Sequence, residues 1–205
     1  MDLYLIRHGE TEWTKAGLYQ GWADVNLNDT GLKQASLIAG YLTNKHIECV
    51  ISSTLSRARD TAAVISERLL CPLMFDERLK EVNVGKWEGK SWKEIAASYS
   101  DFLKDWFLDN VNKPMPGGES YAQLGQRVAS VLEDIISRFR ETVAVVTHGA
   151  VIKTMICQVM GIDLSKRSLF EIDPGSISLI RCDVKKLKCK VTSLNITTHL
   201  EAITR

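Results

Sequence analysis

Two short apolar runs end in the same way, and this repeat constrains the fold and function of the chain more than any other feature. Residues 3–6 run into Arg-His-Gly at 7–9, and residues 143–146 run into Thr-His-Gly at 147–149. Short apolar runs bounded by polar sequence are typical of buried strands. Open α/β sheets bind ligands outside the carboxyl ends of their strands. The repeat therefore predicts two histidines that face one ligand at one edge of a sheet.

Strands and helices alternate along the rest of the chain. Further strands are predicted at 47–51, 73–75, 176–180 and 190–196, the last of them at an edge of the sheet. Helices are predicted at 32–42, 55–70, 91–108, 120–139 and 151–160. This alternation predicts a three-layer α/β/α sandwich with a mostly parallel central sheet. Because the chain has 205 residues, we expect a single domain that spans residues 1–205.

The composition excludes several classes of protein. Lys and Arg number 26 against 25 Asp and Glu, so the net charge of +1 argues against a nucleic-acid or membrane-surface binder that relies on positive charge. The sequence has neither an apolar span of roughly 18–20 residues nor an apolar signal region near its start. Five cysteines without a C-x-x-C pair indicate neither a disulfide framework nor a zinc site. We expect a cytoplasmic protein with mostly buried thiols, no metal and no cofactor.

A third apolar run brings an arginine toward the same edge of the sheet. Residues 47–51 lead to Arg57 on the first turns of a helix, for which Ser53 or Thr54 is the expected N-cap. Helix N-termini favour anions, and the guanidinium forks of Arg7 and Arg57 match phosphate geometry. The predicted pocket thus holds two arginines and two histidines around one small anion. We expect free His8 to be neutral, because two nearby guanidinium groups disfavour a charged imidazole.

These residues resemble the signature of the histidine phosphatase superfamily, and in particular its phosphoglycerate-mutase-like branch. The resemblance starts with Arg-His-Gly-Glu-Thr at 7–11 and covers most of the chain in the order that the family has. The further matching segments lie at 19–24, 27, 30–31, 52–61, 79–89, 116–120 and 146–149.

The resemblance implies a metal-independent phosphomonoester hydrolase that works through a phosphohistidine intermediate. By position, His8 would be the nucleophile, and Glu81 would protonate the leaving alkoxide and then activate water. Arg7, Arg57 and His148 would hold the phosphate oxygens. The residues that the resemblance places around the phosphate pocket are Thr14, Gln20, Gly21, Gly149 and Ala150. Thr14 stands where the family typically has asparagine, which puts its phosphate contact in question.

Three functional interpretations remain open: a phosphatase, a cofactor-dependent phosphoglycerate mutase, and a catalytically silent binding protein. The mutases usually carry Glu-Arg-His-Tyr where this chain has Glu-Val-Asn-Val at 81–84. They also carry a basic insertion before the second histidine, which this chain lacks. Without those cations a second phosphate would be poorly held, so hydrolysis is favoured. The catalytically silent interpretation is disfavoured because the five residues of the expected catalytic set are all present, namely Arg7, His8, Arg57, Glu81 and His148.

Within the phosphatases, the chain is most similar to bacterial α-ribazole-5′-phosphate phosphatases of the cobalamin pathway. Broad-specificity phosphatases and phosphoserine phosphatases share much of the same pattern and stay as alternatives. One or two of the five tryptophans are expected to flank the pocket and to stack on an aromatic substrate. The expected partner is a small phosphorylated metabolite, not a nucleic acid or a membrane. A homodimer is the one protein assembly that we leave open.

Overall fold

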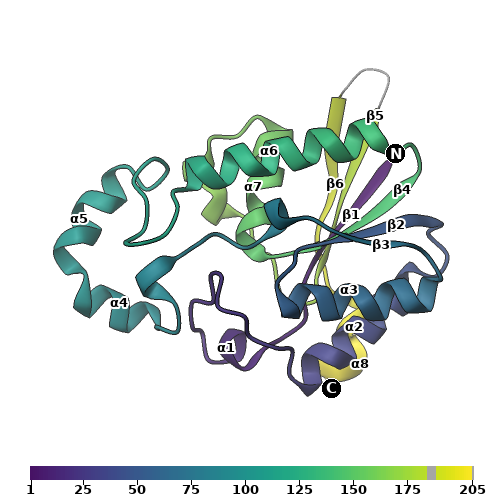
Figure 1. Cartoon of the computed structure of the whole chain (residues 1–205), viewed down its shortest axis with the longest axis horizontal. Coiled ribbons are helices and arrows are strands. Elements are labelled where there is room, and N and C mark those ends of the chain that lie inside the picture. The colour runs from purple at the N-terminus through teal and green to yellow at the C-terminus, as the bar shows by residue number, and fades with distance from the viewer. Residues whose placement is uncertain (184–187, 205) are drawn as a thin grey trace.

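A six-stranded sheet runs through the molecule in the order β3-β2-β4-β1-β5-β6 (Figure 1). The strands are β1 (Asp2–Arg7), β2 (Ile47–Ser52), β3 (Leu73–Phe75), β4 (Thr142–Thr147), β5 (Ile177–Asp183) and β6 (Lys188–Ile196). The four strands from β3 to β1 are parallel to one another, whereas β5 is antiparallel to β1 and β6 is antiparallel to β5. The computed structural model describes residues 1–183 and 188–204. It confirms the mostly parallel sheet and the edge position of β6.

Helices cover both faces of this sheet (Figure 1). They are α1 (Glu12–Lys15), α2 (Asp29–Leu42), α3 (Ser56–Leu69), α4 (Trp92–Ser98), α5 (Ser100–Leu108), α6 (Tyr121–Arg138), α7 (Gly149–Met160) and α8 (Glu201–Thr204), with 3₁₀ turns at Glu77–Leu79, Gly85–Trp87, Leu164–Leu169 and Thr198–Leu200. Because side chains alternate along a strand, β1 gives Leu3 and Leu5 to the core under α6 and α7, and Tyr4 and Ile6 to the core over α2 and α3. The predicted α/β/α sandwich is confirmed.

Helices α4 and α5 extend beyond the end of the sheet (Figure 1). The Trp87 ring, which is 1% exposed, anchors them and packs edge-on against Tyr99, Phe102 and Trp106. The single helix predicted for 91–108 is wrong, because the backbone leaves the helical conformation at Tyr99, where φ is −127°. This excursion places aromatic side chains beside the carboxyl ends of the strands.

The N-terminus of α3 is capped differently from the prediction. Its N-cap is Leu55 rather than Ser53 or Thr54, and Leu55 has no side chain that can accept a hydrogen bond. Asp24, from a loop far away in the sequence, accepts from the Ser56 N–H at 2.7 Å instead. A tertiary contact thus satisfies one of the free N–H groups of the first turn.

Two of the five cysteines form a disulfide bond, which corrects part of the cysteine prediction. Cys182 and Cys189 lie opposite each other on β5 and β6 and are linked. Cys49 and Cys157 are buried thiols as expected, and Cys71 is half-buried. The bridged pair carries no sequence motif, because its proximity depends on the pairing of two strands.

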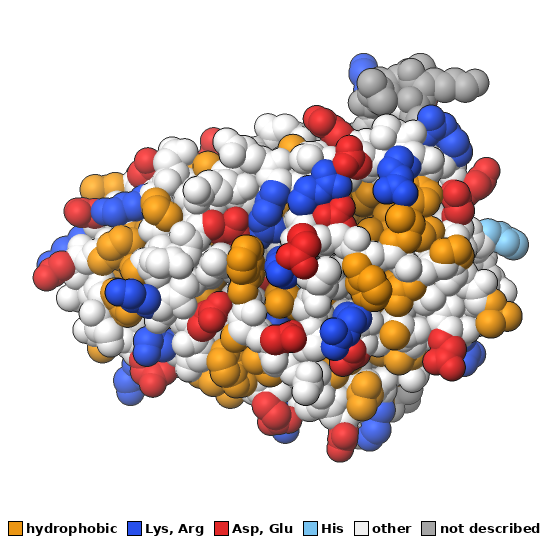
Figure 2. Space-filling view, in the orientation of Figure 1, with side chains coloured by type: hydrophobic (Ala, Val, Ile, Leu, Met, Phe, Trp, Pro, Cys, Tyr) orange, Lys and Arg blue, Asp and Glu red, His pale blue; other side chains and the backbone are white. Residues whose placement is uncertain are grey.

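Charged side chains of both signs intermingle over the face of the molecule in Figure 2. This distribution accords with the net charge of +1 and gives that face no single-sign field. Over the described residues, none of the helices combines the length and the apolar character that crossing a bilayer requires.

Candidate active site

The carboxyl ends of three neighbouring strands bring the predicted site residues together. β1 pairs with β4 so that Arg7 lies opposite Thr147, and the next residue of each chain segment is a histidine. The ring centroids of His8 and His148 lie 5.1 Å apart. On the other side of β4, the end of β2 adds Ser53 to the same edge. The predicted convergence of two histidines is therefore a direct result of the sheet register.

His8 is buried, with 1% of its surface exposed, and its ring is held in one orientation. Its Nδ1 lies 2.7 Å from the carbonyl oxygen of Gly9. A carbonyl oxygen only accepts, so Nδ1 carries the proton and Nε2 keeps a free lone pair. Burial holds the pKa of His8 well below 6.5, and the charges of Arg57 and Arg7 lower it further. The expected neutral imidazole is supported, with burial as a larger cause than the arginines.

His148 is fully buried and is oriented by Ser53, whose hydroxyl oxygen lies 2.8 Å from Nε2. That oxygen already accepts from the N–H of Leu55 at 3.3 Å. If the hydroxyl donates to Nε2, every polar atom of Ser53 is satisfied, as buried groups require. Nδ1 of neutral His148 then carries the proton. It has no hydrogen-bond partner among the described residues, so it is a donor available to a ligand.

Two arginines, the buried Arg57 and the half-buried Arg7, flank the histidines, and backbone carbonyl groups hold both. Arg57 donates from Nη1 to Ala23 at 2.8 Å and from Nη2 to Gly21 at 2.7 Å, and Arg7 donates from Nη1 to Ile172 at 2.6 Å. Burial lowers the pKa of Arg57 to about 10, so the side chain stays cationic at neutral pH. The Nε atoms of Arg7 and Arg57 lack partners within the described part of the chain. The site is therefore strongly electropositive.

Glu81 points its carboxylate at the N-terminus of α7. Its Oε1 accepts from the N–H of Val82 at 2.9 Å and from the N–H of Ala150 at 3.2 Å. Its negative charge acts on both Arg7 and Arg57, which places it beside the same cluster. A carboxyl group in this position can exchange a proton with a ligand held by the arginines.

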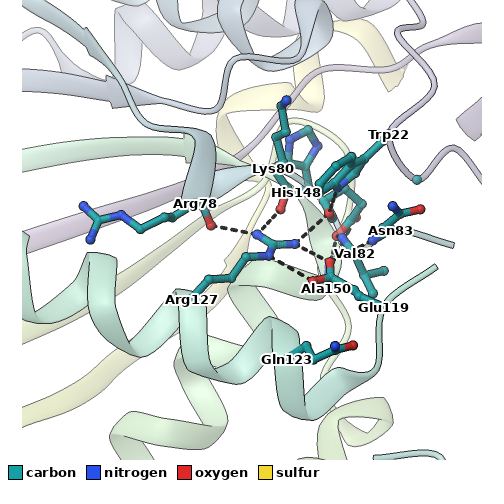
Figure 3. A network of polar contacts seen from close by, with 12 residues as sticks. Trp22, Arg78, Lys80, Val82, Asn83, Glu119, Gln123, Arg127, His148 and Ala150 are labelled. Carbon is teal, nitrogen blue, oxygen red and sulfur yellow. Dashed lines mark hydrogen bonds and ion pairs between the residues drawn. The ribbon is translucent and has the colours of Figure 1, made fainter. Parts of the chain in front are cut away.

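Arg127 on α6 holds the segment that carries Glu81, and the sequence analysis did not single it out. Its guanidinium donates to the carbonyl oxygens of Arg78, Lys80 and Glu81 at 2.7, 2.6 and 2.8 Å, and it forms an ion pair with Glu119 (Figure 3). Four acceptors on one planar fork fix the backbone just before the carboxylate.

Two further contacts lock the same segment. Glu119 also accepts from the N–H of Asn83 at 2.8 Å, and the indole N–H of Trp22 donates to the Glu81 carbonyl at 2.7 Å (Figure 3). Ser120 caps α6 with a capping box, which agrees with the predicted start of this helix at residue 120. The Pro-Gly-Gly-Glu-Ser motif therefore has two roles: Ser120 begins a helix, and Glu119 supports the Glu81 loop.

A cavity of about 280 Å³ opens over these groups. The predicted site residues on its wall are Arg7, Thr14, Gln20, Gly21, Glu81 and Ala150. His8, Arg57 and His148 lie buried behind that wall, at 0–1% exposure. Gly149 lies against Arg7, since a Cβ built on Gly149 would be 3.7 Å from the guanidinium carbon. The structure thus brings all ten predicted site residues to one region, in two layers.

Two of the polar wall residues differ in what they offer to a ligand. The amide oxygen of Gln20 accepts from the Thr11 hydroxyl at 3.0 Å, which leaves its NH₂ group as the end that can face a ligand. The Thr14 hydroxyl donates to the Thr11 carbonyl at 2.9 Å and accepts from the Thr11 N–H at 2.8 Å, closing the capping box of α1. Thr14 therefore lines the cavity with its hydroxyl already engaged.

A second cavity, also of about 280 Å³, adjoins the first and shares Tyr19, Tyr121 and Ala150 with it. The other residues on its wall are Trp92, Trp106, Phe107, Lys153, Arg167 and Ser168. Two of the tryptophans thus flank the site, as expected. The two cations were not among the predicted site residues. Among the residues described, no group of three or more His, Cys, Asp or Glu side chains is arranged to hold a metal ion.

Comparison with known proteins gives the following matches. The chain matches the family model of the "Histidine phosphatase superfamily (branch 1)" over residues 3–197. It is 35% identical to "Phosphoserine phosphatase 1" of Hydrogenobacter thermophilus, over 98% of this chain and 94% of that protein. It is 32% identical to a "Probable phosphoglycerate mutase" of Serratia proteamaculans, over 79% of this chain and 76% of that one. The crystal structure of the α-ribazole phosphatase from Shigella flexneri superposes with a TM-score of 0.84 at 26% identity, over 96% of each chain.

Proposed function

The chain belongs to the histidine phosphatase superfamily, and from this premise we propose that it hydrolyses small phosphomonoesters through a phosphohistidine on His8, without a metal ion. One observation carries the proposal. Two neutral imidazoles meet at the ends of paired strands, with Nε2 of His8 free to attack and Nδ1 of His148 free to donate. Neither nitrogen has a hydrogen-bond partner among the described residues, and the proposed phosphoryl transfer uses both.

In the first step, the lone pair on Nε2 of His8 attacks phosphorus, and the bond between phosphorus and the ester oxygen breaks. The carboxyl group of Glu81 gives its proton to the leaving alkoxide. Arg7, Arg57 and the Nδ1–H of His148 stabilise the three equatorial oxygens, whose charge the transition state spreads. The N–H groups that begin α7 add partial positive charge at the same place.

In the second step, water attacks the phosphoryl group and the bond from Nε2 to phosphorus breaks. Glu81, now a carboxylate, takes the proton of the attacking water, so the enzyme returns to its starting state and inorganic phosphate leaves. Splitting the hydrolysis in two replaces one difficult displacement with two easier ones.

Two substrates are supported by different observations. The aromatic rings on the second cavity and the likeness to the Shigella flexneri structure favour α-ribazole 5′-phosphate. The match over nearly the full length to a protein named phosphoserine phosphatase favours phosphoserine. The mutase alternative also has a basis. The mutases carry their additional cations before the second histidine, whereas Lys153 and Arg167 supply cations after it.

A substrate panel on the purified chain tests this proposal. It includes p-nitrophenyl phosphate, phosphoserine, α-ribazole 5′-phosphate, and 3-phosphoglycerate with and without its bisphosphate cofactor. We expect phosphate release that resists EDTA and disappears in His8→Ala. Mutase turnover that exceeds phosphate release, or inhibition by EDTA, would overturn the proposed reaction.

A further inference from the structure

Lys153 is a half-buried cation that the proposed phosphoryl chemistry does not use. It lies on α7 one turn beyond Gly149 and Ala150, which puts the three residues on one face of the helix. Side chains on a helix lean toward its N-terminus, so the Lys153 side chain extends back toward the phosphate end of the site. Its position on the wall of the second cavity agrees with this direction.

Within the described residues, the Lys153 ammonium makes neither a hydrogen bond nor an ion pair. Burial lowers its pKa, and the charge of Arg7 lowers it further, while Glu81 and the exposed Glu171 act in the opposite direction. Holding a cation partly away from water without a partner costs free energy unless an anion compensates it. The site therefore has an unmatched positive charge at its outer end.

Arg167 strengthens this positive charge and is fixed in place. Its guanidinium carbon lies 3.4 Å from the centre of the Tyr121 ring, and Nη1 donates to Asn110 at 2.8 Å and to the Leu164 carbonyl at 2.9 Å. Among the described residues that line the two cavities, Glu81 is the only acidic side chain. A ligand that spans both cavities thus meets two cations at the end opposite the phosphate site.

We propose that Lys153, with Arg167 behind it, binds a carboxylate of the substrate. The inference rests on the proposed function and narrows it to phosphomonoesters of small hydroxy acids or amino acids. The shared wall of the two cavities, formed by Tyr19, Tyr121 and Ala150, joins the phosphate and carboxylate ends into one site. Phosphoserine satisfies both ends, whereas α-ribazole 5′-phosphate has no carboxylate for Lys153.

The test compares phosphoserine with phosphoethanolamine, which differ only by the carboxylate. The measured quantity is the ratio of their kcat/KM values. A charged hydrogen bond contributes about 1.5–3 kcal/mol, which corresponds to about a 10- to 150-fold preference. We expect the wild type to prefer phosphoserine by this factor, Lys153→Met to lose most of it, and Lys153→Arg to retain it. Lys166→Met, at an exposed lysine outside both cavities, is the matched control and should keep the wild-type ratio.

Two results would overturn the assignment: a wild type that does not distinguish the two substrates, or a folded Lys153→Met protein with the wild-type ratio. Circular dichroism establishes that the variant is folded. If Lys153→Met is not folded, inhibition of the wild type tests the proposal instead. 3-Phosphoglycerate, which has a carboxylate, should inhibit p-nitrophenyl phosphate hydrolysis more strongly than glycerol 3-phosphate, which has none. Equal inhibition would contradict the proposal. Failure of the proposed function would look different: the wild type would release no phosphate from any phosphomonoester, would be inhibited by EDTA, or would show more mutase turnover than phosphate release.

Discussion

The two cavities of the site are built from different parts of the fold. The inner one has its reactive groups just after strand ends, on the first turn of α3 and in the loop of Glu81, and backbone carbonyls and N–H groups hold His8, Arg57 and Glu81. The outer one is walled by residues of α4, α5, α6, α7 and a 3₁₀ turn, and Phe107 packs edge to face with Trp92 and Trp106. Trp92 and Phe107 remain 42% and 56% exposed.

On the proposed function, we infer that the groups around the strand ends carry out the chemistry and that the helices around the outer cavity select the substrate. His8 and His148 directly follow paired strands, so changes at these two residues should affect every substrate alike. The outer groups lie on helices and a 3₁₀ turn, of which α4 and α5 extend beyond the end of the sheet (Figure 1), so changes there should affect substrates unequally.

The largest effect is expected for His8→Ala. Removing the nucleophile should lower kcat by about 10⁴- to 10⁶-fold for phosphoserine and p-nitrophenyl phosphate alike. Steady-state hydrolysis measures both. The matched control is His46→Ala, because His46 is exposed and lies just before β2, at the end of that strand opposite the site. A loss confined to one substrate would contradict the assignment of His8 to the common chemistry.

Glu81→Gln should have the next largest effect, and that effect should depend on the leaving group. Phosphoserine needs a proton on its departing alkoxide, so kcat should fall by about 10²- to 10⁴-fold. The p-nitrophenolate ion leaves without a proton, so its release should fall far less. Single-turnover measurements of the phosphorylation step with both substrates compare the losses. Equal losses would argue against Glu81 as the proton donor.

The variant Arg127→Gln tests whether Arg127 positions the Glu81 carboxyl group or only stabilises the fold. Arg127 and Glu119 are 17% and 15% exposed, and breaking such a pair should lower the free energy of unfolding by about 3 kcal/mol. If Arg127 positions Glu81, the variant should also lose about 10-fold or more in kcat for phosphoserine, with the same leaving-group dependence as Glu81→Gln. Urea unfolding and the two-substrate assay measure these effects.

The control for this variant is Arg78→Gln, whose guanidinium pairs with Asp76 and Asp134 at 34% exposure. We expect a stability loss of at most about 1 kcal/mol and no leaving-group signature. An Arg127→Gln enzyme that is less stable but treats both substrates equally would reduce Arg127 to a structural role.

The smallest effect concerns pH. Because burial holds the pKa values of His8 and His148 well below 6.5, both rings should stay neutral at pH 6, where an ordinary histidine would be only about a quarter neutral. In the unfolded chain both histidines have ordinary pKa values, so as the pH falls they bind protons before the buried pair of the folded chain does. The free energy of unfolding should therefore be retained above pH 6.5 and fall as the pH drops below it. NMR titration of the two rings, with the urea-unfolded chain as reference, measures the midpoints. Midpoints at or above 6.5 would contradict a buried, neutral pair.

The inner cavity was largely predictable from the sequence. His8 and His148 each follow an apolar run directly, so the parallel sheet alone brings them together. The family resemblance, the α/β/α fold and the phosphatase class are confirmed by the family match over residues 3–197 and by the sheet. The roles of the individual site residues stay predictions until the experiments above are done.

The outer cavity was not predictable to the same extent, for a physical reason. The helix predicted at 151–160 begins at Gly149 instead. Because of this earlier start, Lys153 lies one turn after the helix N-terminus that faces the phosphate site, which the predicted bounds did not indicate. Arg167 depends on the path of a 3₁₀ turn, and Arg127 on how α6 packs over the Glu81 loop. Such positions follow from tertiary packing, which periodicity in the sequence does not encode.

The proposed reaction requires a covalent phosphohistidine on His8, and this intermediate can be trapped and identified. Because Nδ1 of His8 is occupied by its hydrogen bond to the Gly9 carbonyl, the phosphoryl group should attach to Nε2. The measurement is a rapid quench into alkaline denaturant during turnover, followed by mass spectrometry of the His8 peptide and ³¹P NMR to identify the nitrogen. The proposed mechanism predicts one phosphoryl group on Nε2 of His8. A phosphoryl group on His148 or on Nδ1 of His8, or turnover without any phosphohistidine, would contradict it.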